Sequence, residues 1–199
     1  MITPIKTLLF IGAGVYQTKG ILKAKELGYR VVAVDEDTNA EGFEHVDNFL
    51  NINIFEHVKI IEFAKNENVY AVLSISSDIC LETVAVVNEA LGFPSMTLDQ
   101  IRLISNKGLM RKKLYEFDIK DINFFILKEI SEISEALEVI NFPLVVKPVD
   151  SSGSRGVSYV KNEQELISKC KLAFDFSRTN EILLEEYMDG KEVAVDGFV

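Results

Sequence analysis

Residues Phe142 to Val157 read F-P-L-V-V-K-P-V-D-S-S-G-S-R-G-V. Few local structures require residue types in this order. The apolar run Leu144 to Val146 is bounded by prolines, which predicts a short buried strand. The run ends at a cation, Lys147, whose burial would be costly unless an anion met it. Pro148 favours an extended backbone at the lysine before it. A strand that ends in an extended lysine is therefore expected here.

A loop rich in glycine and serine follows this strand and contains Ser151, Ser152, Gly153, Ser154, Arg155 and Gly156. Its flexible backbone and hydroxyl groups offer hydrogen-bond donors that can surround an anion such as a phosphate. Val157 to Val160 then predicts a returning strand. The whole stretch is interpreted as a phosphate-binding hairpin, and an ordinary surface hairpin with a solvated lysine is the alternative. Arg155 would either clamp a phosphate or face solvent.

The composition of the 199-residue chain limits the classes of protein to consider. The length suits one large or two small domains. A net charge of -10 argues against general binding to nucleic acids or anionic membranes, which reward clustered Lys and Arg. Cys80 and Cys170 lie far apart and are expected to be free core thiols in a reducing compartment. Because neither a membrane-spanning segment nor a signal segment is recognisable, we expect a cytoplasmic protein.

The first part of the chain alternates between strand and helix patterns. A strand at Lys6 to Ile11, a glycine turn at Gly12 to Gln17, a helix that stops at Gly28 and a strand at Val31 to Val34 predict a right-handed βαβ unit. Asp35 ends the second strand, where a dinucleotide-binding unit places an acidic residue on a ribose. Gln17, however, occupies the position of the third glycine of that motif. A tight turn without a ligand is the alternative interpretation.

The alternation continues with strands at 47–52 and 70–75 and helices at 56–66 and 79–91. Ser76 to Asp78 are expected to cap the second of these helices, and they also form a weak substrate-site candidate at the carboxyl end of a parallel strand. His45 and His57 have no partner at metal-ligand spacing and are expected on the surface. Glycine, proline and serine at 92–95 predict a domain boundary, so that the domains comprise residues 1–94 and 95–199.

The second part begins with a helical pattern over Thr97 to Phe117, for which Thr97 is the expected cap. Its basic residues are expected to be mostly solvated, and they are Lys107, Arg111, Lys112 and Lys113. The remaining predicted elements are a strand at 123–127, a helix at 131–140, a helix that begins at Asn162, a strand at Ile182 to Glu185 and a last strand at Val193 to Val199.

Three separated motifs carry a family resemblance. They are S-N-K at 105–107, the F-P-L-V-V-K-P segment with its glycine loop, and I-L-L-E-E-Y-M-D-G-K-E at 182–192. In this order and spacing they resemble the ATP-grasp superfamily, which includes biotin carboxylase, the purine-pathway ligases, carbamoyl-phosphate synthetase and D-alanine-D-alanine ligase. The resemblance implies an α/β fold, with a Rossmann-like, parallel-sheet preATP-grasp domain at 1–94. Linker helices and an incomplete α+β ATP-grasp subdomain would follow at 95–199. The G-A-G turn is closest in style to the purine-ligase and carbamoyl-phosphate-synthetase branch.

The resemblance also implies roles for individual residues in binding ATP. Lys107 and Lys147 match the two lysines that contact the ATP phosphates, and the loop 151–156 matches the mobile loop that closes over them. Glu185 would lie near the exocyclic amine of adenine. Backbone groups near Tyr187 and Met188 would read the edge of the base, and Glu192 would accept hydrogen bonds from the ribose. No catalytic residue is assigned, and Glu186 and Asp189 receive no role.

By the same resemblance, we expect an ATP-dependent ligase that activates a carboxylate or bicarbonate as an acyl phosphate for attack by an amine. Family members continue further, and their later part holds Mg²⁺. We therefore expect a partial chain whose metal ligands lie beyond Val199 and which has little or no turnover alone. An unpaired last strand could let two copies pair as a homodimer. A non-catalytic nucleotide-binding regulatory or scaffold module and an NAD-binding domain on Gly12 to Asp35 are the alternatives. The acceptor substrate and the amine are not readable from the sequence.

Overall fold

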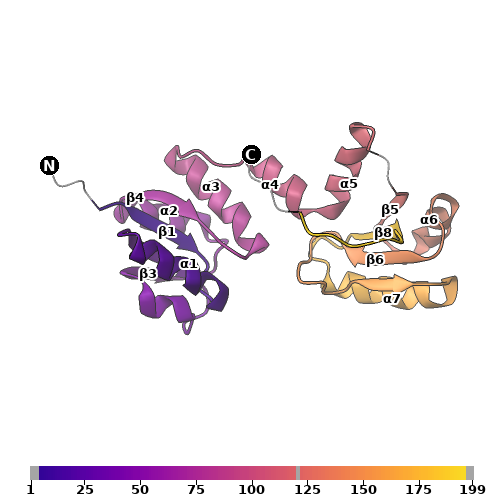
Figure 1. Cartoon of the computed structure of the whole chain (residues 1–199), viewed down its shortest axis with the longest axis horizontal. Helices are drawn as coiled ribbons and strands as arrows, with labels where there is room; N and C mark the ends of the chain where they lie inside the picture. Colours follow the sequence, from indigo (N-terminus) through magenta and orange to yellow (C-terminus); the bar gives the residue numbers. More distant parts are fainter. Residues whose placement is uncertain (1–4, 120–121, 196–199) are drawn as a thin grey trace. The chain divides into compact units, whose positions relative to one another are not determined.

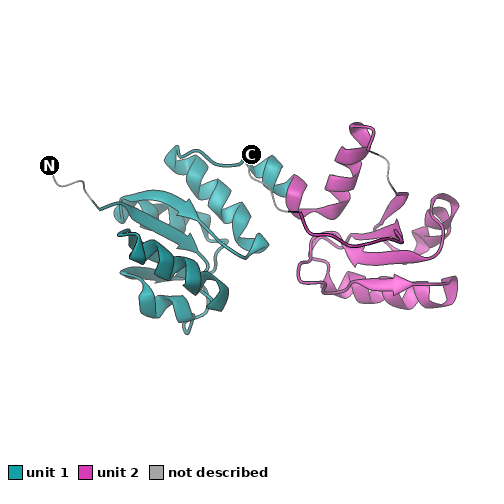
Figure 2. Ribbon diagram, in the orientation of Figure 1, with its two compact units in different colours: residues 1–102 teal, residues 103–199 magenta. Residues whose placement is uncertain are grey.

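The computed structural model describes residues 5–119 and 122–195. The chain divides into two compact units, Met1–Arg102 and Leu103–Val199 (Figure 2). The division falls inside helix α4 (Leu98–Ser105), whereas the sequence suggests a domain boundary at residues 94 and 95. That domain assignment stays a prediction, and each unit is described by itself.

A four-stranded parallel sheet forms the centre of the first unit. Its strands are β1 (Thr7–Ile11), β2 (Arg30–Asp35), β3 (Asn48–Asn51) and β4 (Val69–Leu73), in the order β3-β2-β1-β4. Helix α1 (Val15–Glu26) packs on one face, while α2 (His57–Asn66) and α3 (Leu81–Leu91) pack on the other (Figure 1). Because helices cover both faces, the central strands are continuous apolar runs rather than alternating ones. The predicted βαβ unit is confirmed.

Two short 3-10 helices, Glu41–His45 and Asp78–Cys80, complete the first unit. The expected cap at Ser76 to Asp78 is wrong, because a 3-10 turn precedes α3 and Ser77 makes no side-chain cap. The Cys80 thiol instead donates a hydrogen bond to the Ser77 hydroxyl over 3.3 Å. Polar residues at a strand end can thus form hydrogen bonds within the loop itself rather than cap the following helix.

An antiparallel sheet with the order β5-β8-β6-β7 forms the centre of the second unit. Its strands are β5 (Phe124–Leu127), β6 (Leu144–Pro148), β7 (Ser158–Val160) and β8 (Ile182–Glu186). Helices α6 (Ile133–Val139), which follows a 3-10 turn at Ile130–Glu132, and α7 (Glu163–Phe176) cover one face of this sheet. The predicted hairpin is confirmed as β6 and β7. The helix predicted to begin at Asn162 is α7, and the Asn162 side chain caps it.

The predicted helix from Thr97 to Phe117 is in fact two helices, α4 and α5 (Lys107–Glu116). Asn106 separates them because its side chain accepts a hydrogen bond from Leu109 N over 3.0 Å and thereby starts a new helix. Thr97 caps α4 as expected, through reciprocal hydrogen bonds with Gln100 of 2.8 and 3.3 Å. The predicted last strand is not formed over residues 193–195, and residues 196–199 lie outside the described residues.

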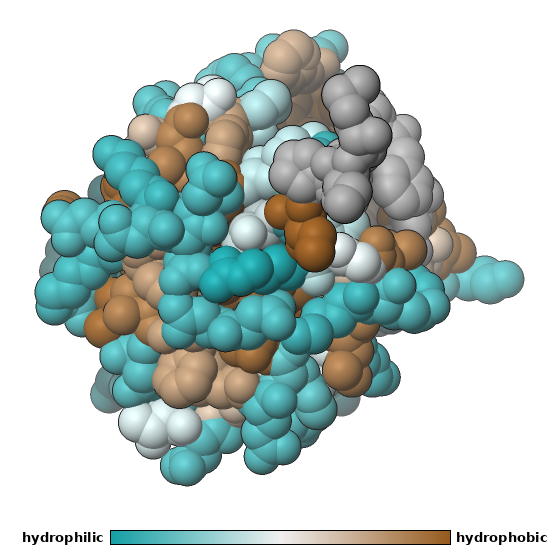
Figure 3. Space-filling view, turned by 90° about the vertical axis from the view of Figure 1, so that its left-hand side faces the viewer, coloured by the Kyte–Doolittle hydropathy of each residue, from teal (hydrophilic) through white to brown (hydrophobic). Residues whose placement is uncertain are grey.

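The surface of the first unit is mixed in character. The face in Figure 3 is mostly hydrophilic, with separate hydrophobic areas, as is usual for a folded domain. Within residues 5–119 and 122–195, none of the helices has the length and apolar character needed to cross a membrane.

Candidate functional site

The two faces of the second unit's sheet differ in chemistry. Side chains alternate between the faces along a strand, so that Leu144 and Val146 point into the core with α6 and α7. Val145 and Lys147 therefore lie on the opposite face. The register pairs Val145 with Glu185 on β8 and with Tyr159 on β7, which places all four on this opposite face. We call these four residues, Val145, Lys147, Tyr159 and Glu185, the charged face.

Helix α5 borders the charged face on the side of β5. The rings of Tyr115 and Phe124 meet edge-to-face, with their centroids 5.1 Å apart. Gly108 lies so close to the Ile126 side chain that an added Cβ would come within 2.9 Å of it. The glycine after Lys107 therefore allows the start of α5 to approach the sheet closely.

Lys107 joins the start of α5 to the glycine-serine loop. Its backbone N–H donates to the Val149 carbonyl over 2.8 Å, and its ammonium donates to the Ser151 carbonyl over 2.6 Å. The contact with Ser151 connects residues 44 positions apart in the sequence. Of the residues predicted to contact phosphate, Lys107 and the loop are thus brought together.

The loop from Ser151 to Gly156 is fixed at its ends and exposed in its middle. At its start, the Asp150 carboxylate accepts hydrogen bonds from the N–H groups of Arg178 and Thr179, at 3.1 and 2.9 Å. At its end, Gly156 has a φ of +73° and packs so tightly that an added Cβ would lie 2.9 Å from Pro148. Residues 152–155 between these anchors are exposed.

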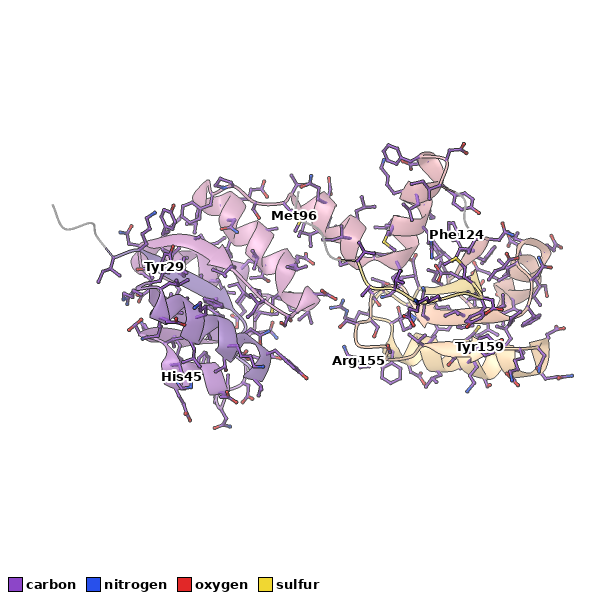
Figure 4. All side chains as sticks on the ribbon, in the orientation of Figure 1. Tyr29, His45, Met96, Phe124, Arg155 and Tyr159 are labelled. Atoms are coloured by element: carbon purple, nitrogen blue, oxygen red, sulfur yellow. The ribbon has the colours of Figure 1, made fainter. Side chains whose placement is uncertain are left out.

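Arg155 lies within this exposed part of the loop (Figure 4). Its guanidinium donates to the Ser152 carbonyl over 3.2 Å, a contact inside the loop. Gly153 and Ser154 have φ values of +65° and +58°, so two successive residues adopt the left-handed conformation. Such turns present backbone N–H groups in a form suited to anions.

Glu185 is the most buried charged residue of the site, with an exposed fraction of 4%. Its Oε1 accepts a hydrogen bond from Arg111 Nε over 2.5 Å, and its Oε2 pairs with the Lys147 ammonium. A buried carboxylate needs such partners, because its desolvation is otherwise costly. The expectation that the basic residues of this helix are mostly solvated is therefore wrong for Arg111, and sequence reasoning missed its role.

The remaining predicted residues follow β8. The Tyr187 N–H donates to the Pro143 carbonyl over 2.9 Å, and its ring meets Tyr159 edge-on with centroids 4.9 Å apart. Met188 is 60% exposed. Glu192 is exposed in a segment without helix or strand, and it has no hydrogen-bond partner among the described residues. The structure thus brings Tyr187 to the site's edge but does not join Glu192 to it.

Tyr159 and Glu186 are two further residues that the sequence reasoning left out. Tyr159 lies on β7 (Figure 4). Because side chains alternate between the two faces of a strand, the register of the predicted hairpin could have placed Tyr159 on the same face as Lys147. Glu186 accepts hydrogen bonds from the backbone and side chain of Asn141, both at 2.9 Å, and from Asn123 at 3.1 Å. Burial raises the pKa of Glu186, but these hydrogen bonds outweigh it, so that the net pKa lies below its ordinary value. Glu186 fastens β8 to neighbouring loops.

The donor set fits a nucleotide better than it fits a metal ion. Two ammonium groups, Lys107 and Lys147, and a left-handed turn suit a polyphosphate. Residues 5–119 and 122–195 contain no group of three or more His, Cys, Asp or Glu side chains that could hold a metal ion. The assignments of individual ATP-contacting residues stay predictions.

The polar groups in and around the glycine turn of the first unit form hydrogen bonds with each other. The two carboxylate oxygens of Asp35 accept hydrogen bonds from the N–H groups of Ala13 and Asp37, at 2.7 and 3.0 Å. Gln17 is buried and donates to the Ile75 carbonyl over 2.6 Å. Asp35 and Gln17 therefore have structural roles that need no ligand.

Comparison with known proteins identifies relatives for both units. Residues 103–197 match the family described as D-ala D-ala ligase C-terminus. Formate-dependent phosphoribosylglycinamide formyltransferase from Prochlorococcus marinus (strain NATL1A) is 28% identical over 194 residues, which cover 92% of this chain and 48% of that protein. The chain thus spans about half the length of the curated relatives it matches.

Solved structures show the same fold. N5-carboxyaminoimidazole synthetase from Staphylococcus aureus, complexed with ADP, superposes with a TM-score of 0.76 at 21% identity, and covers 94% of this chain and 48% of its own. The biotin carboxylase domain of 2-oxoglutarate carboxylase from Hydrogenobacter thermophilus, a dimer with MgADP, ADP and bicarbonate, gives 0.75 at 20% identity, with 94% and 45% covered. At these identities the likeness establishes the fold alone, and it confirms the predicted fold class.

Proposed function

The chain is a member of the ATP-grasp superfamily, and from that premise we propose that the protein is an ATP-dependent ligase. It would activate a small carboxylate or bicarbonate as an acyl phosphate, which an amine then attacks with release of phosphate. The observation that carries this proposal is the 2.6 Å hydrogen bond from the Lys107 ammonium to the Ser151 carbonyl. This bond joins the first predicted phosphate-binding lysine to the predicted phosphate loop.

Each element of the site has a task in this proposal. ATP supplies the phosphoryl group. Lys107 and Lys147 would neutralise part of the polyphosphate charge, and the exposed residues of the loop would exclude water from the reacting groups. Tyr187 and Met188 are exposed, and the Tyr187 ring meets Tyr159 edge-on, so that this segment offers an apolar border suited to a flat base. Positioning and charge neutralisation are the contributions that this chain's residues can make.

The acceptor and the metal belong to the same proposal. The relatives are, by their names, a formate-dependent phosphoribosylglycinamide formyltransferase, an N5-carboxyaminoimidazole synthetase and the biotin carboxylase domain of a 2-oxoglutarate carboxylase. For this protein we infer a small-molecule carboxylate or bicarbonate and an amine. Mg²⁺ between the ATP phosphates would be held by residues outside those described.

Release of ADP and phosphate by the full-length protein, measured with candidate carboxylates and amines, tests this function. Lys147→Ala is expected to reduce turnover by at least roughly a hundredfold, because a charge next to the transferring phosphate is lost. Lys171→Ala is the matched control, since Lys171 is an exposed lysine of α7 in the same unit. Undiminished turnover in Lys147→Ala would contradict the site assignment. ATP binding without turnover for any acceptor would favour a non-catalytic nucleotide-binding module instead.

A further inference from the structure

The contacts of Arg111 extend the proposed nucleotide site. We propose that Arg111 is a positioning residue that takes up part of the charge of Glu185 and thereby leaves the Lys147 ammonium available to a phosphate. This inference rests on the proposed function, because it concerns the same site. It assigns a role to a residue that has no obvious ligand contact of its own.

The spacing of Arg111 on α5 places it next to the site. Arg111 lies four residues after Lys107, and side chains at this spacing share one face of a helix. Lys107 contacts the glycine-serine loop at Ser151, and Arg111 contacts Glu185 of β8. Consecutive turns of α5 therefore contact the glycine-serine loop and the charged face.

The charge balance of the three side chains explains why Arg111 matters. The side chains of Arg111, Lys147 and Glu185 are 18%, 19% and 5% exposed, so water screens their charges only in part. Without Arg111, Lys147 and Glu185 would form a neutral pair, and the ammonium would be drawn to both carboxylate oxygens. With Arg111 on Oε1, the three side chains carry one net positive charge.

The ammonium of Lys147 has donors beyond the one that Glu185 uses. A lysine ammonium carries three N–H groups, and Glu185 accepts through its Oε2. The alternation of β6 directs Lys147 to the charged face rather than to the core. An anionic ligand on this face would therefore meet a cation whose charge is not cancelled by its neighbour.

A purely structural role for Arg111 makes a different prediction. If Arg111 only ties α5 to β8, then its removal harms the fold, and removal of the Glu185 charge cannot repair the damage. If Arg111 balances charge, then replacing Glu185 by neutral Gln in the same protein restores the net positive charge through Lys147 alone. A double variant therefore separates the two roles.

The test is isothermal titration calorimetry with ADP and with adenosine, which lacks the phosphates. Arg111→Met is expected to weaken ADP binding by roughly tenfold, the size of one charge-assisted hydrogen bond, and to leave adenosine binding unchanged within about twofold. In Arg111→Met with Glu185→Gln, the ratio of ADP affinity to adenosine affinity is expected to return to within about threefold of the wild-type ratio, because any change in the contact with adenine affects both ligands alike. Thermal melts of each variant record whether it folds.

Two further variants complete the design. Arg111→Lys keeps the positive charge and is expected to retain most of the preference for ADP, whereas a role that depends on the planar guanidinium predicts the same loss as in Arg111→Met. Lys113→Met is the matched control on the same helix, because Lys113 pairs with Glu116 and its side chain is 47% exposed. It is expected to bind both ligands as the wild-type protein does.

The outcomes distinguish this inference from the function on which it rests. A wild-type protein that binds ADP no more tightly than adenosine overturns the proposed function and this inference with it. A wild-type protein that prefers ADP, together with a double variant no better than Arg111→Met or an Arg111→Lys variant equally impaired, overturns the role of Arg111 alone.

Discussion

The two glycine-containing turns of the molecule, Gly12–Gln17 in the first unit and Ser151–Gly156 in the second, each contain two glycines but lie in different environments. In the first turn, the N–H of Ala13 is bound by Asp35, the Ala13 carbonyl accepts from Gly42, and Gln17 is buried. In the second turn, the ends are anchored and residues 152–155 are exposed.

This difference indicates how a structural turn and a ligand loop can be told apart. Glycines permit an unusual backbone in both, so that their number does not decide the matter. What decides is whether the surrounding polar groups already have partners within the protein. The first turn satisfies its polar groups internally, whereas the second has exposed backbone next to two lysines.

Gly156→Ala breaks the second turn at its anchored end and carries the largest expected effect on stability. The new Cβ would lie 2.9 Å from Pro148 and 3.0 Å from Phe176, in a residue with a φ of +73°. Overpacking and left-handed strain together should lower the free energy of unfolding by about 3 kcal/mol. Urea unfolding followed by circular dichroism measures this. Gly153→Ala is the control, because its Cβ has nothing within 4 Å and only strain of about 1 kcal/mol applies.

Asp35→Ala breaks the first turn. The buried N–H of Ala13 loses its acceptor, so that the free energy of unfolding should fall by about 2 kcal/mol, while the affinity for ADP stays unchanged. The exposed Asp37, whose carboxylate accepts a hydrogen bond from Asn39 N, provides the control variant Asp37→Ala with a smaller loss. A marked loss of nucleotide affinity in Asp35→Ala would return the dinucleotide interpretation of the first turn to consideration.

Lys107→Met tests whether the lysine next to the second turn contributes to nucleotide binding. The variant removes the ammonium that touches the Ser151 carbonyl, and ADP affinity should fall roughly tenfold by calorimetry. Lys112→Met, an exposed lysine of the same helix, should leave ADP affinity unchanged. Equal affinities in the two variants would count against a phosphate role for Lys107.

Glu186→Gln tests the smallest effect, which depends on pH. The pKa of Glu186 is lowered in the folded protein, so its carboxylate contributes stability above its unfolded pKa, and this contribution is lost as pH falls through the folded pKa. The difference in unfolding free energy between wild-type and Glu186→Gln should therefore shrink between about pH 6 and about pH 3. A difference that does not change over this range would show that the carboxylate's charge is irrelevant.

Local patterns predicted the elements that depend on neighbours in sequence. The proline-bounded run at 144–146 became β6, the cap at Thr97 formed as expected, and the helix predicted to begin at Asn162 formed as α7. The alternation of strands and helices likewise predicted the parallel sheet of the first unit. In each case the sequence pattern lies within a few neighbouring residues, although the strands then pair over longer separations, as Thr7 does with Arg30.

The features that the sequence did not predict depend on distant partners. Arg111 resembles its exposed neighbours Lys112 and Lys113 in sequence, and only the position of Glu185 on β8 distinguishes it. The break at Asn106 is an exception, because it follows from a local side-chain cap on Leu109 that competes with continuation of the helix. Tyr159 joins the charged face only through the strand register.

The central claim is that the second unit, and not the glycine turn of the first, receives the nucleotide phosphates. Backbone amide chemical shifts measured by nuclear magnetic resonance during titration with ADP test it most directly. We predict that the largest shifts fall on Lys107, on residues 151–156 and on residues 185–188, while residues 12–17 and Asp35 remain unchanged. Large shifts confined to residues 12–17 and Asp35, with the glycine-serine loop unaffected, would contradict the account.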